Sequence, residues 1–383
     1  MQLLRTEDWP GVKVARFSTS GAATEYHLTL LPRAEGTFQE QAKQLYQMYK
    51  KVLSTLKLSQ ETTVFQRFFF SDLINQRECL LKTFSPLLTD VCALSLVEQP
   101  PLPPAKIALW AYHLSDSQLT KSGTTDFLSL SRGKITHHWL TGITATQGKT
   151  SYQQTCKIFQ KCARLLQKKK MNLADNLLRT WIFVRDIDSH YHGMVKARRE
   201  FFATCGLTPQ THFVASSGIA GGSIPGALVT LDAYAVSGLI REQIQYLSAP
   251  DYLSPTYIYG VTFERGTSII YADRKHHLIS GTASIDNSGR ILYPGDLDSQ
   301  LDRTLENISA LLTAASATLK DVACFICYVR DPSDHKKIQQ AMENKFPQTP
   351  SLVLFAPVCR TGWLVEVECL AITPNSAPGL PLF

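Results

Sequence analysis

Two glutamates, Glu366 and Glu368, stand two residues apart in the last apolar segment of the chain, 363–372. The segment is rich in β-branched residues and ends just before Pro374, which predicts a buried strand. Because side chains alternate along a strand, both carboxylates should point to one face. Burial and a neighbouring carboxylate both raise a carboxyl pKa, so Glu366 could act as an acid near neutral pH. The alternative is an edge strand whose second face is wet.

Segments of the same shape occur twice earlier in the chain. Segment 228–236 has Thr230 and Asp232 at the positions of the two glutamates, and segment 106–114 has Ala108 and Trp110 there. The scaffold therefore does not need a carboxylate at the position of Glu366. Its presence in a single copy indicates a function.

The rest of the chain repeats in the same way. A strand-to-helix corner ending in aspartate recurs at 69–72, 183–186 and 328–331. Three tandem units of order β-β-α-β-α-β-β follow from this repeat, the first of them degenerate. Helical periodicity predicts helices at 38–57, 73–83, 151–170, 192–204, 297–317 and 332–346. We predict an α+β fold of mixed sheets with helices packed on one face. The expected boundaries are units at 1–114, 135–245 and 246–383, with an exposed polar connection at 115–134.

The amino-acid composition excludes several classes of protein and of partner. With 383 residues, 44% of them hydrophobic, the chain can bury a large core. It has no apolar run of signal-peptide or membrane-spanning length, so a cytoplasmic location without a membrane partner is expected. Nine cysteines without a spacing framework favour reduced thiols. The net charge of +7 suits a small anionic ligand, but basic residues interleaved with aromatic ones are missing, so nucleic acid is not an expected partner.

No cofactor or metal is expected from the sequence. Cys324 and Cys327 should lie on opposite faces of a strand, and no second ligand pair completes a zinc site. The histidine pairs at 137–138 and 276–277 recur at matching strand starts, which favours a scaffold role. No glycine pattern of the phosphate-binding or dinucleotide-binding type occurs.

The motifs of the third unit are those of a known superfamily. They are Ser-Gly-Thr-Ala at 280–283, a turn with Asn and Gly at 286–289, Gln300 with Glu-Asn-Ile at 306–308, Tyr-Val-Arg-Asp at 328–331 and Val-Glu-Val-Glu at 365–368. With these motifs the unit resembles the Rid (YjgF, endoribonuclease L-PSP) superfamily. Rid domains form trimers with clefts between subunits. Three tandem copies imply a pseudo-trimer within one monomeric chain, with a homo-oligomer as the alternative.

Residues 175–373 resemble more specifically the chorismatases. The matching segments are Arg-Thr-Trp at 179–181, the helix at 191–198, the glycine-rich loop at 217–222 and Phe-Glu-Arg-Gly-Thr at 263–267. The resemblance implies cofactor-independent removal of pyruvate from chorismate or a similar enolpyruvyl acid to give a hydroxybenzoate. Glu366 falls on the family's catalytic glutamate. Cys359 and Gly281 fall on positions that separate its subtypes, and they resemble the branch that makes 3-hydroxybenzoate.

A substrate with two carboxylates calls for bidentate arginines. Arg265 is the first candidate, and Arg179 or Arg198 the second. Tyr259 could donate its hydroxyl to a carboxylate, and Glu368 could orient Glu366. Each residue also has a structural alternative. The arginines could be surface residues, Tyr259 a packed strand residue, Gly281 a site of close backbone packing, Cys359 an inert buried thiol and Glu368 a structural hydrogen-bond partner.

Two departures bear on the activity. Chorismatases commonly have Tyr-Gly-Pro-Arg before the Phe-x-Arg strand, whereas here Tyr259-Gly260 runs through Val261-Thr262 to Phe263 without that arginine. Imine-deaminating Rid proteins hold the substrate carboxylate with an arginine at the position of Ser351, so imine hydrolysis is disfavoured. The rival functions are a non-enzymatic carboxylate-binding or regulatory Rid protein and, third, a Rid-type imine deaminase or ribonuclease.

Overall fold

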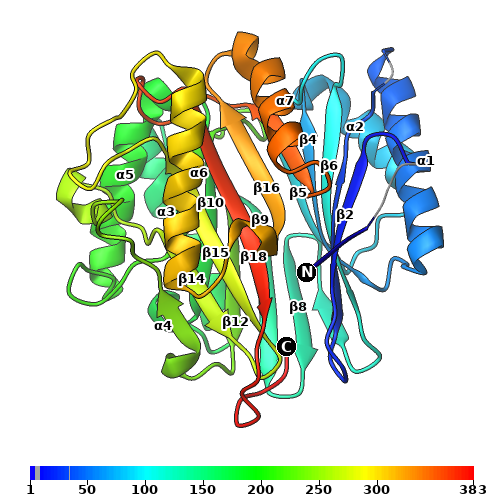
Figure 1. Ribbon diagram of the computed structural model, residues 1–383, viewed down its shortest axis with the longest axis horizontal. Helices are drawn as coiled ribbons and strands as arrows, with labels where there is room; N and C mark the ends of the chain where they lie inside the picture. The colour runs from blue at the N-terminus through cyan, green and yellow to red at the C-terminus, as the bar shows by residue number, and fades with distance from the viewer. Residues whose placement is uncertain (5–8, 34) are drawn as a thin grey trace.

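The computed structural model describes residues 1–4, 9–33 and 35–383, and it contains three mixed sheets of six strands each (Figure 1). Numbered from its own first strand, every sheet has the same order, 1-2-3-6-4-5. Only the last two neighbours in each sheet are parallel. The predicted tandem α+β units with mixed sheets are therefore confirmed, but each unit has three strands before its first α-helix where two were predicted.

Each unit contributes one sheet and its own helices. The first unit comprises β1 (Gln2–Leu4), β2 (Val12–Phe17), β3 (Thr24–Leu30), α1 (Phe38–Leu56), β4 (Thr63–Phe70), α2 (Leu73–Phe84), β5 (Ala93–Glu98) and β6 (Ile107–Ser115). The second comprises β7 (Thr120–Gly123), β8 (Phe127–Arg132), β9 (Ile135–Thr144), α3 (Ser151–Gln167), α4 (Leu173–Asn176), β10 (Leu177–Val184), α5 (Ile187–Thr204), β11 (Ala215–Ala220) and β12 (Val229–Ser237). The third comprises η1 (Arg241–Gln243), β13 (Ile244–Tyr246), η2 (Thr256–Tyr259), β14 (Gly266–Ile270), β15 (Arg274–Ala283), α6 (Leu297–Ala314), η3 (Leu319–Asp321), β16 (Val322–Val329), η4 (Pro332–Asp334), α7 (His335–Lys345), β17 (Ser351–Phe355) and β18 (Val365–Pro374).

The segment 115–134 is not the exposed connection that we predicted. It holds β7 and β8, the edge hairpin of the second sheet, and Leu128 and Leu130 of β8 are fully buried. The hairpin is rich in Ser, Thr and Gly because one strand lies at the sheet edge, where the outer face is wet. The second sheet therefore begins at Thr120 and the third at Ile244, earlier than expected.

Helix starts follow the local sequence. Thr37, Asp72, Thr150 and Asp296 each accept a hydrogen bond from the backbone amide three residues later, as N-cap residues do. These caps fix where the helices begin, and the predicted helices agree with the observed ones to within a few residues at most ends. Among the described residues, no helix is both long and apolar enough to cross a membrane.

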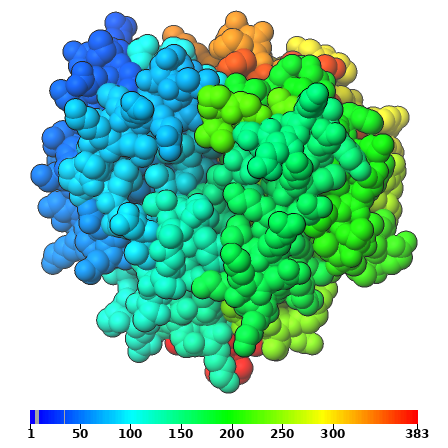
Figure 2. All heavy atoms as spheres, turned by 180° about the vertical axis from the view of Figure 1, so that it is seen from behind, coloured from blue at the N-terminus to red at the C-terminus, as the bar shows by residue number. Residues whose placement is uncertain are grey.

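The three units close into a ring, with the helices outside and the sheets facing the centre (Figure 1). Strand β5 lies against β9, β11 against β15, and β16 against β2 and β3, so each unit contacts both others. The first and second units lie directly against each other in Figure 2. The arrangement is a pseudo-trimer within one chain.

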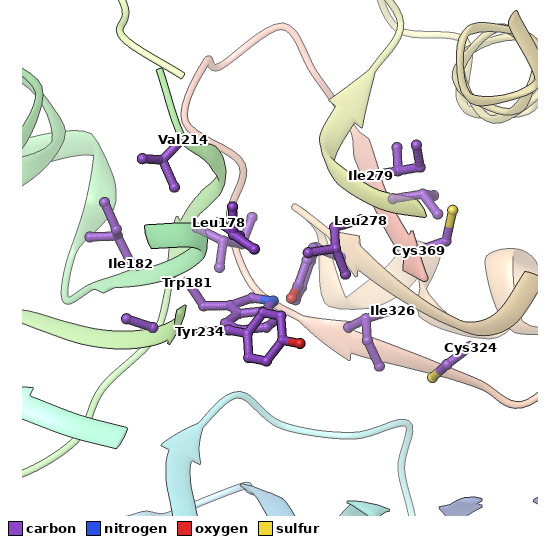
Figure 3. Close-up of a cluster of buried hydrophobic side chains, with 14 of the residues drawn as sticks. Leu178, Trp181, Ile182, Val214, Tyr234, Leu278, Ile279, Cys324, Ile326 and Cys369 are labelled. Carbon is purple, nitrogen blue, oxygen red and sulfur yellow. The ribbon is translucent and has the colours of Figure 1, made fainter. Parts of the chain in front are cut away.

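The interfaces between units are as apolar as a core. Trp181 and Tyr234 of the second unit face Leu278, Ile326 and Cys369 of the third (Figure 3). All five side chains are less than 10% exposed. Since burying a large apolar side chain contributes about 1.5–3 kcal/mol, these contacts hold the second and third units in fixed relative positions.

Candidate active site

A cavity of about 330 Å³ lies between the second and third units. The third unit supplies β15, β18 and the loops before β14 and β18, and the second unit supplies α5 and β11. The cavity collects six of the eight residues predicted for the site, namely Glu366, Cys359, Arg265, Gly281, Tyr259 and Arg198. The predicted cleft between units thus coincides with the predicted residues.

Glu366 reaches the cavity from the central strand β18, opposite Ala283 and Tyr328. The residue is only 5% exposed, and within the described part of the chain its carboxyl makes no hydrogen bond. Burial, followed by the charge of Glu368, raises the pKa of Glu366 to about 8, although Arg179 and Arg265 act in the opposite direction. At neutral pH the side chain is therefore mainly a neutral carboxylic acid, and its O–H is available to donate a proton to a ligand.

Gly281 lies beside this carboxyl at an irregularity of the β15–β18 pairing. A Cβ atom at Gly281 would stand 2.1 Å from Glu366 Oε1 and 3.2 Å from Ser217 Oγ. Only glycine leaves Glu366 room to enter the cavity in this geometry. The structural alternative for Gly281 was close packing. The group that packs closely against Gly281 is the Glu366 carboxyl itself.

If Glu366 donates a proton in catalysis, Gly281→Ala should lower the rate about 10²-fold, because the added methyl group displaces the Glu366 carboxyl. The steady-state rate should be measured beside Gly379→Ala, a glycine with no atom within 4 Å of its added Cβ. Equal rates for the two variants would contradict this role of Gly281.

Arg265 immediately precedes β14 and is 6% exposed. Its Nε and Nη2 donate to the carbonyl oxygen of Ser254 at 3.3 and 2.8 Å. The guanidinium carbon lies 5.4 Å from the ring centroid of Tyr259. Tyr259 lies in the 3₁₀ helix η2, not in a strand, and its ring covers the arginine. The pair provides a cation and a hydroxyl in the cavity wall.

Arg198 of α5 enters from the second unit and is 2% exposed. Its Nη1 donates to Ser216 Oγ at 3.3 Å, and its buried Nε finds no acceptor among the described residues. A buried guanidinium with an unused donor is suited to an anionic ligand, because an unmade hydrogen bond in the interior costs free energy.

Cys359 lies on the loop before β18 and contacts the same cavity. A hydrogen bond joins its thiol to the hydroxyl of Tyr191. Burial, with the added charge of Glu366, raises the pKa of Cys359 to about 12. The side chain is therefore a neutral thiol at physiological pH, and it shapes the cavity wall without carrying charge.

Arg179 and Glu368, which we predicted to bind or orient the substrate, lie outside the cavity. Arg179 Nη2 donates to Glu368 Oε2 and to Ser217 Oγ, both at 2.7 Å, and Trp181 Nε1 donates to Glu368 Oε1 at 2.8 Å. The Ser217 hydroxyl donates to Glu368 and accepts from the Gly281 amide at 2.9 Å. The cross-unit ion pair is held by Ser217 and Trp181 as well, so it positions the Glu366 strand, although Arg179 Nη1 finds no acceptor among the described residues.

The comparisons with known proteins agree with this architecture. The family Endoribonuclease L-PSP matches residues 270–373. A RutC family protein of Pyrococcus abyssi is 30% identical over 95 residues, which cover 24% of this chain and 75% of that protein. The chain belongs to the Rid (RutC, endoribonuclease L-PSP) family. The 3-aminoacrylate deaminase RutC of Acinetobacter baylyi is 31% identical over 70 residues, covering 18% of this chain and 56% of the deaminase.

A larger part of this Rid protein matches a solved structure. The crystal structure of a chorismatase superposes with a TM-score of 0.61, covering 81% of this chain and 93% of the chorismatase at 17% sequence identity. At that identity the likeness shows a shared fold. The resemblance to Rid proteins and to chorismatases that the motifs indicated is confirmed at the level of family and architecture.

Several residues that line the Rid cavity were missed by the sequence analysis. The most important is Arg360, whose guanidinium carbon lies 4.5 Å from the Tyr259 ring centroid and 4.9 Å from that of Trp363. Its position next to Cys359 was a usable signal. The others are His192, Lys196 and Arg199 on α5, which become neighbours of Arg360 only through the contact between units. Arg360 adds a cation near Tyr259 and Gly260, where the common chorismatase arginine is missing.

Proposed function

We propose that this Rid protein removes pyruvate from chorismate, or from a similar enolpyruvyl acid, and forms a hydroxybenzoate without a cofactor. The observation that carries the proposal is the Glu366 carboxyl, which is buried with a pKa of about 8 and faces a cavity with the buried arginines Arg198 and Arg265. A neutral acid surrounded by cations is what protonation of an anionic enol ether requires.

The reaction begins with proton transfer from Glu366 to the terminal methylene carbon of the enolpyruvyl group. The carbon that bears the ether oxygen becomes an oxocarbenium ion, and the new Glu366 carboxylate stabilises it by charge. Water adds to that carbon, and the hemiketal releases pyruvate and a ring alcohol. A hydroxybenzoate forms when the ring then loses a hydroxyl group and a ring proton as water, so the water consumed first is returned.

Two carboxylates on the substrate match the arginines that the two units contribute to the cavity. Arg265, covered by Tyr259 and adjacent to Arg360, would hold one carboxylate, and Arg198 from the second unit would hold the other. Fixing both ends would place the enolpyruvyl group against Glu366. Since the arginines come from two units, the site depends on the contact between them.

The choice of ring product would depend on the cavity wall. Cys359 presents a neutral thiol, and Gly281 leaves space beside the acid. Together with the resemblance of these two positions to the 3-hydroxybenzoate branch, this supports 3-hydroxybenzoate as the product.

The test is incubation of the purified full chain with chorismate. Pyruvate is followed by coupled reduction to lactate, and the aromatic product is identified by chromatography against the hydroxybenzoate isomers. We expect equal amounts of pyruvate and hydroxybenzoate. Pyruvate release no faster than in buffer would refute the activity on chorismate and would leave a carboxylate-binding Rid protein as the alternative.

A further inference from the structure

A second cavity, of about 580 Å³, lies between the third and first units. It is lined by α7 and the start of β17 from the third unit, and by residues around β2 and the end of β3 from the first. In the ring of units it occupies the place equivalent to the site described above, because each cavity lies where the parallel edge strand of one unit meets the first strands of the next. Its size falls in the range of small-molecule sites.

The strand registers identify which residues correspond in the two cavities. Counted along the paired strands from Ala108 and Glu366, Lys13 of β2 occupies the position that Arg265 occupies beside β14. Counted in the same way, Ser351 at the start of β17 corresponds to Ser216 of β11. The second cavity therefore keeps a cation and a hydroxyl at the places where the first has Arg265 and Ser216.

The cation is held inside the cavity. Lys13 Nζ lies 3.4 Å from Ser351 Oγ, and burial lowers the pKa of Lys13, an effect that the charge of Glu343 partly offsets. Arg33 and Lys336 add positive charge at the exposed rim. Three cationic side chains against one carboxylate make the cavity attractive to an anion.

The remaining wall has a polar part, formed by Thr29, Gln339 and Gln340, and an apolar part with one aromatic side chain. Trp9 lines the cavity together with Leu31, Leu102 and Leu352. A cavity lined by both an indole and a cation suits a planar ligand with a carboxylate at one end. No acid corresponds to Glu366, because Ala108 holds that position.

We propose that this cavity is a second site, which binds a small planar carboxylate of the benzoate type and does not transform it. Lys13 holds the carboxylate, and Trp9 packs against the ring. The site is independent of the chemistry at Glu366, so it would exist even if the protein released no pyruvate.

The test uses the full chain with ¹⁵N-labelled tryptophan, titrated with benzoate. Of the five tryptophans, Trp9 lines the second cavity, Trp363 lines the first, and the other three lie in the core between units, so each indole N–H signal reports one place. Trp9→Phe and Trp363→Phe assign the two signals. We expect a saturable shift of the Trp9 signal that persists in Gly281→Ala, where the first cavity is perturbed.

Variants of the second cavity decide between the proposal and nonspecific binding. Lys13→Met should raise the dissociation constant measured from the Trp9 signal about tenfold or more, and Lys13→Arg should return it to the parent value. Glu343→Gln removes the carboxylate that lines the cavity and should lower the dissociation constant severalfold. Unchanged thermal unfolding midpoints would exclude misfolding. A Trp9 signal that does not move, that moves equally in Lys13→Met, or that responds to inorganic phosphate as it does to benzoate would overturn the proposal.

Discussion

Glu366→Gln should lower the turnover of chorismate about 10³-fold at pH 7. Glutamine keeps the size of the side chain but cannot donate a proton to carbon, and general acid catalysis contributes about 10²–10⁴-fold. The substrate carboxylates would still meet Arg198 and Arg265, so the loss should appear in kcat with little change in KM. The measurement is steady-state pyruvate release, with a fold check by thermal unfolding.

The repeat provides a matched control for this variant. Thr230 holds the position of Glu366 in the second unit, where its hydroxyl bonds to Ser223 Oγ at 2.5 Å. Thr230→Val changes an equivalent buried strand position away from the cavity, so its turnover should stay within about twofold of the parent. If Glu366→Gln kept more than a tenth of the parent rate, the proton donor would have to be another group.

Arg179→Met should destabilise the protein by about 3–5 kcal/mol. The substitution leaves Glu368, which is 4% exposed, as a buried carboxylate without its cation, and such half-pairs cost about that much. The ion pair bridges the second and third units at 2.7 Å, so the loss falls on their interface. Urea unfolding followed by tryptophan fluorescence measures the change in free energy.

The double variant Arg179→Met/Glu368→Gln separates the ion pair from the rest of the arginine's packing. Removing both charges should return more than half of the lost stability, because no unpaired charge remains. The first and second units are joined by a comparable pair, Arg67 and Asp232 at 2.9 Å, which the variant leaves intact. A loss below about 1 kcal/mol in Arg179→Met would show that the pair adds nothing to the interface.

The sequence was sufficient for the features that depend on one strand or helix. The alternation of the last segment placed Glu366 and Glu368 on one buried face, and the repeats predicted three tandem units with a common order of elements. It was not sufficient where a residue's role is set by a partner from another unit. Arg179 resembled a ligand residue, yet its Nη2 pairs with Glu368 from the third unit, and Arg360 was overlooked because its stacking partner Tyr259 lies about a hundred residues away.

Edge strands were the other source of error. Strands β7 and β8 carry the Ser, Thr and Gly residues of a loop, because one of them borders solvent. Strand β5 alternates buried and half-buried residues at the edge of the first sheet, a pattern from which no strand was predicted. The hydrophobic pattern of an edge strand is weak by nature, whereas that of a central strand such as β18 is strong.

The central claim is that neutral Glu366 delivers the proton, and the pH dependence of kcat/KM for pyruvate release tests it most directly. The acid form is present below the pKa of about 8, so kcat/KM should be level from about pH 6 to 7.5. Above pH 8, kcat/KM should fall about tenfold per pH unit as Glu366 ionises. The pH profile of Glu366→Gln should not show this decline. A decline centred near pH 4–5, a profile level beyond pH 9, or no pyruvate from the parent at any pH would contradict the account.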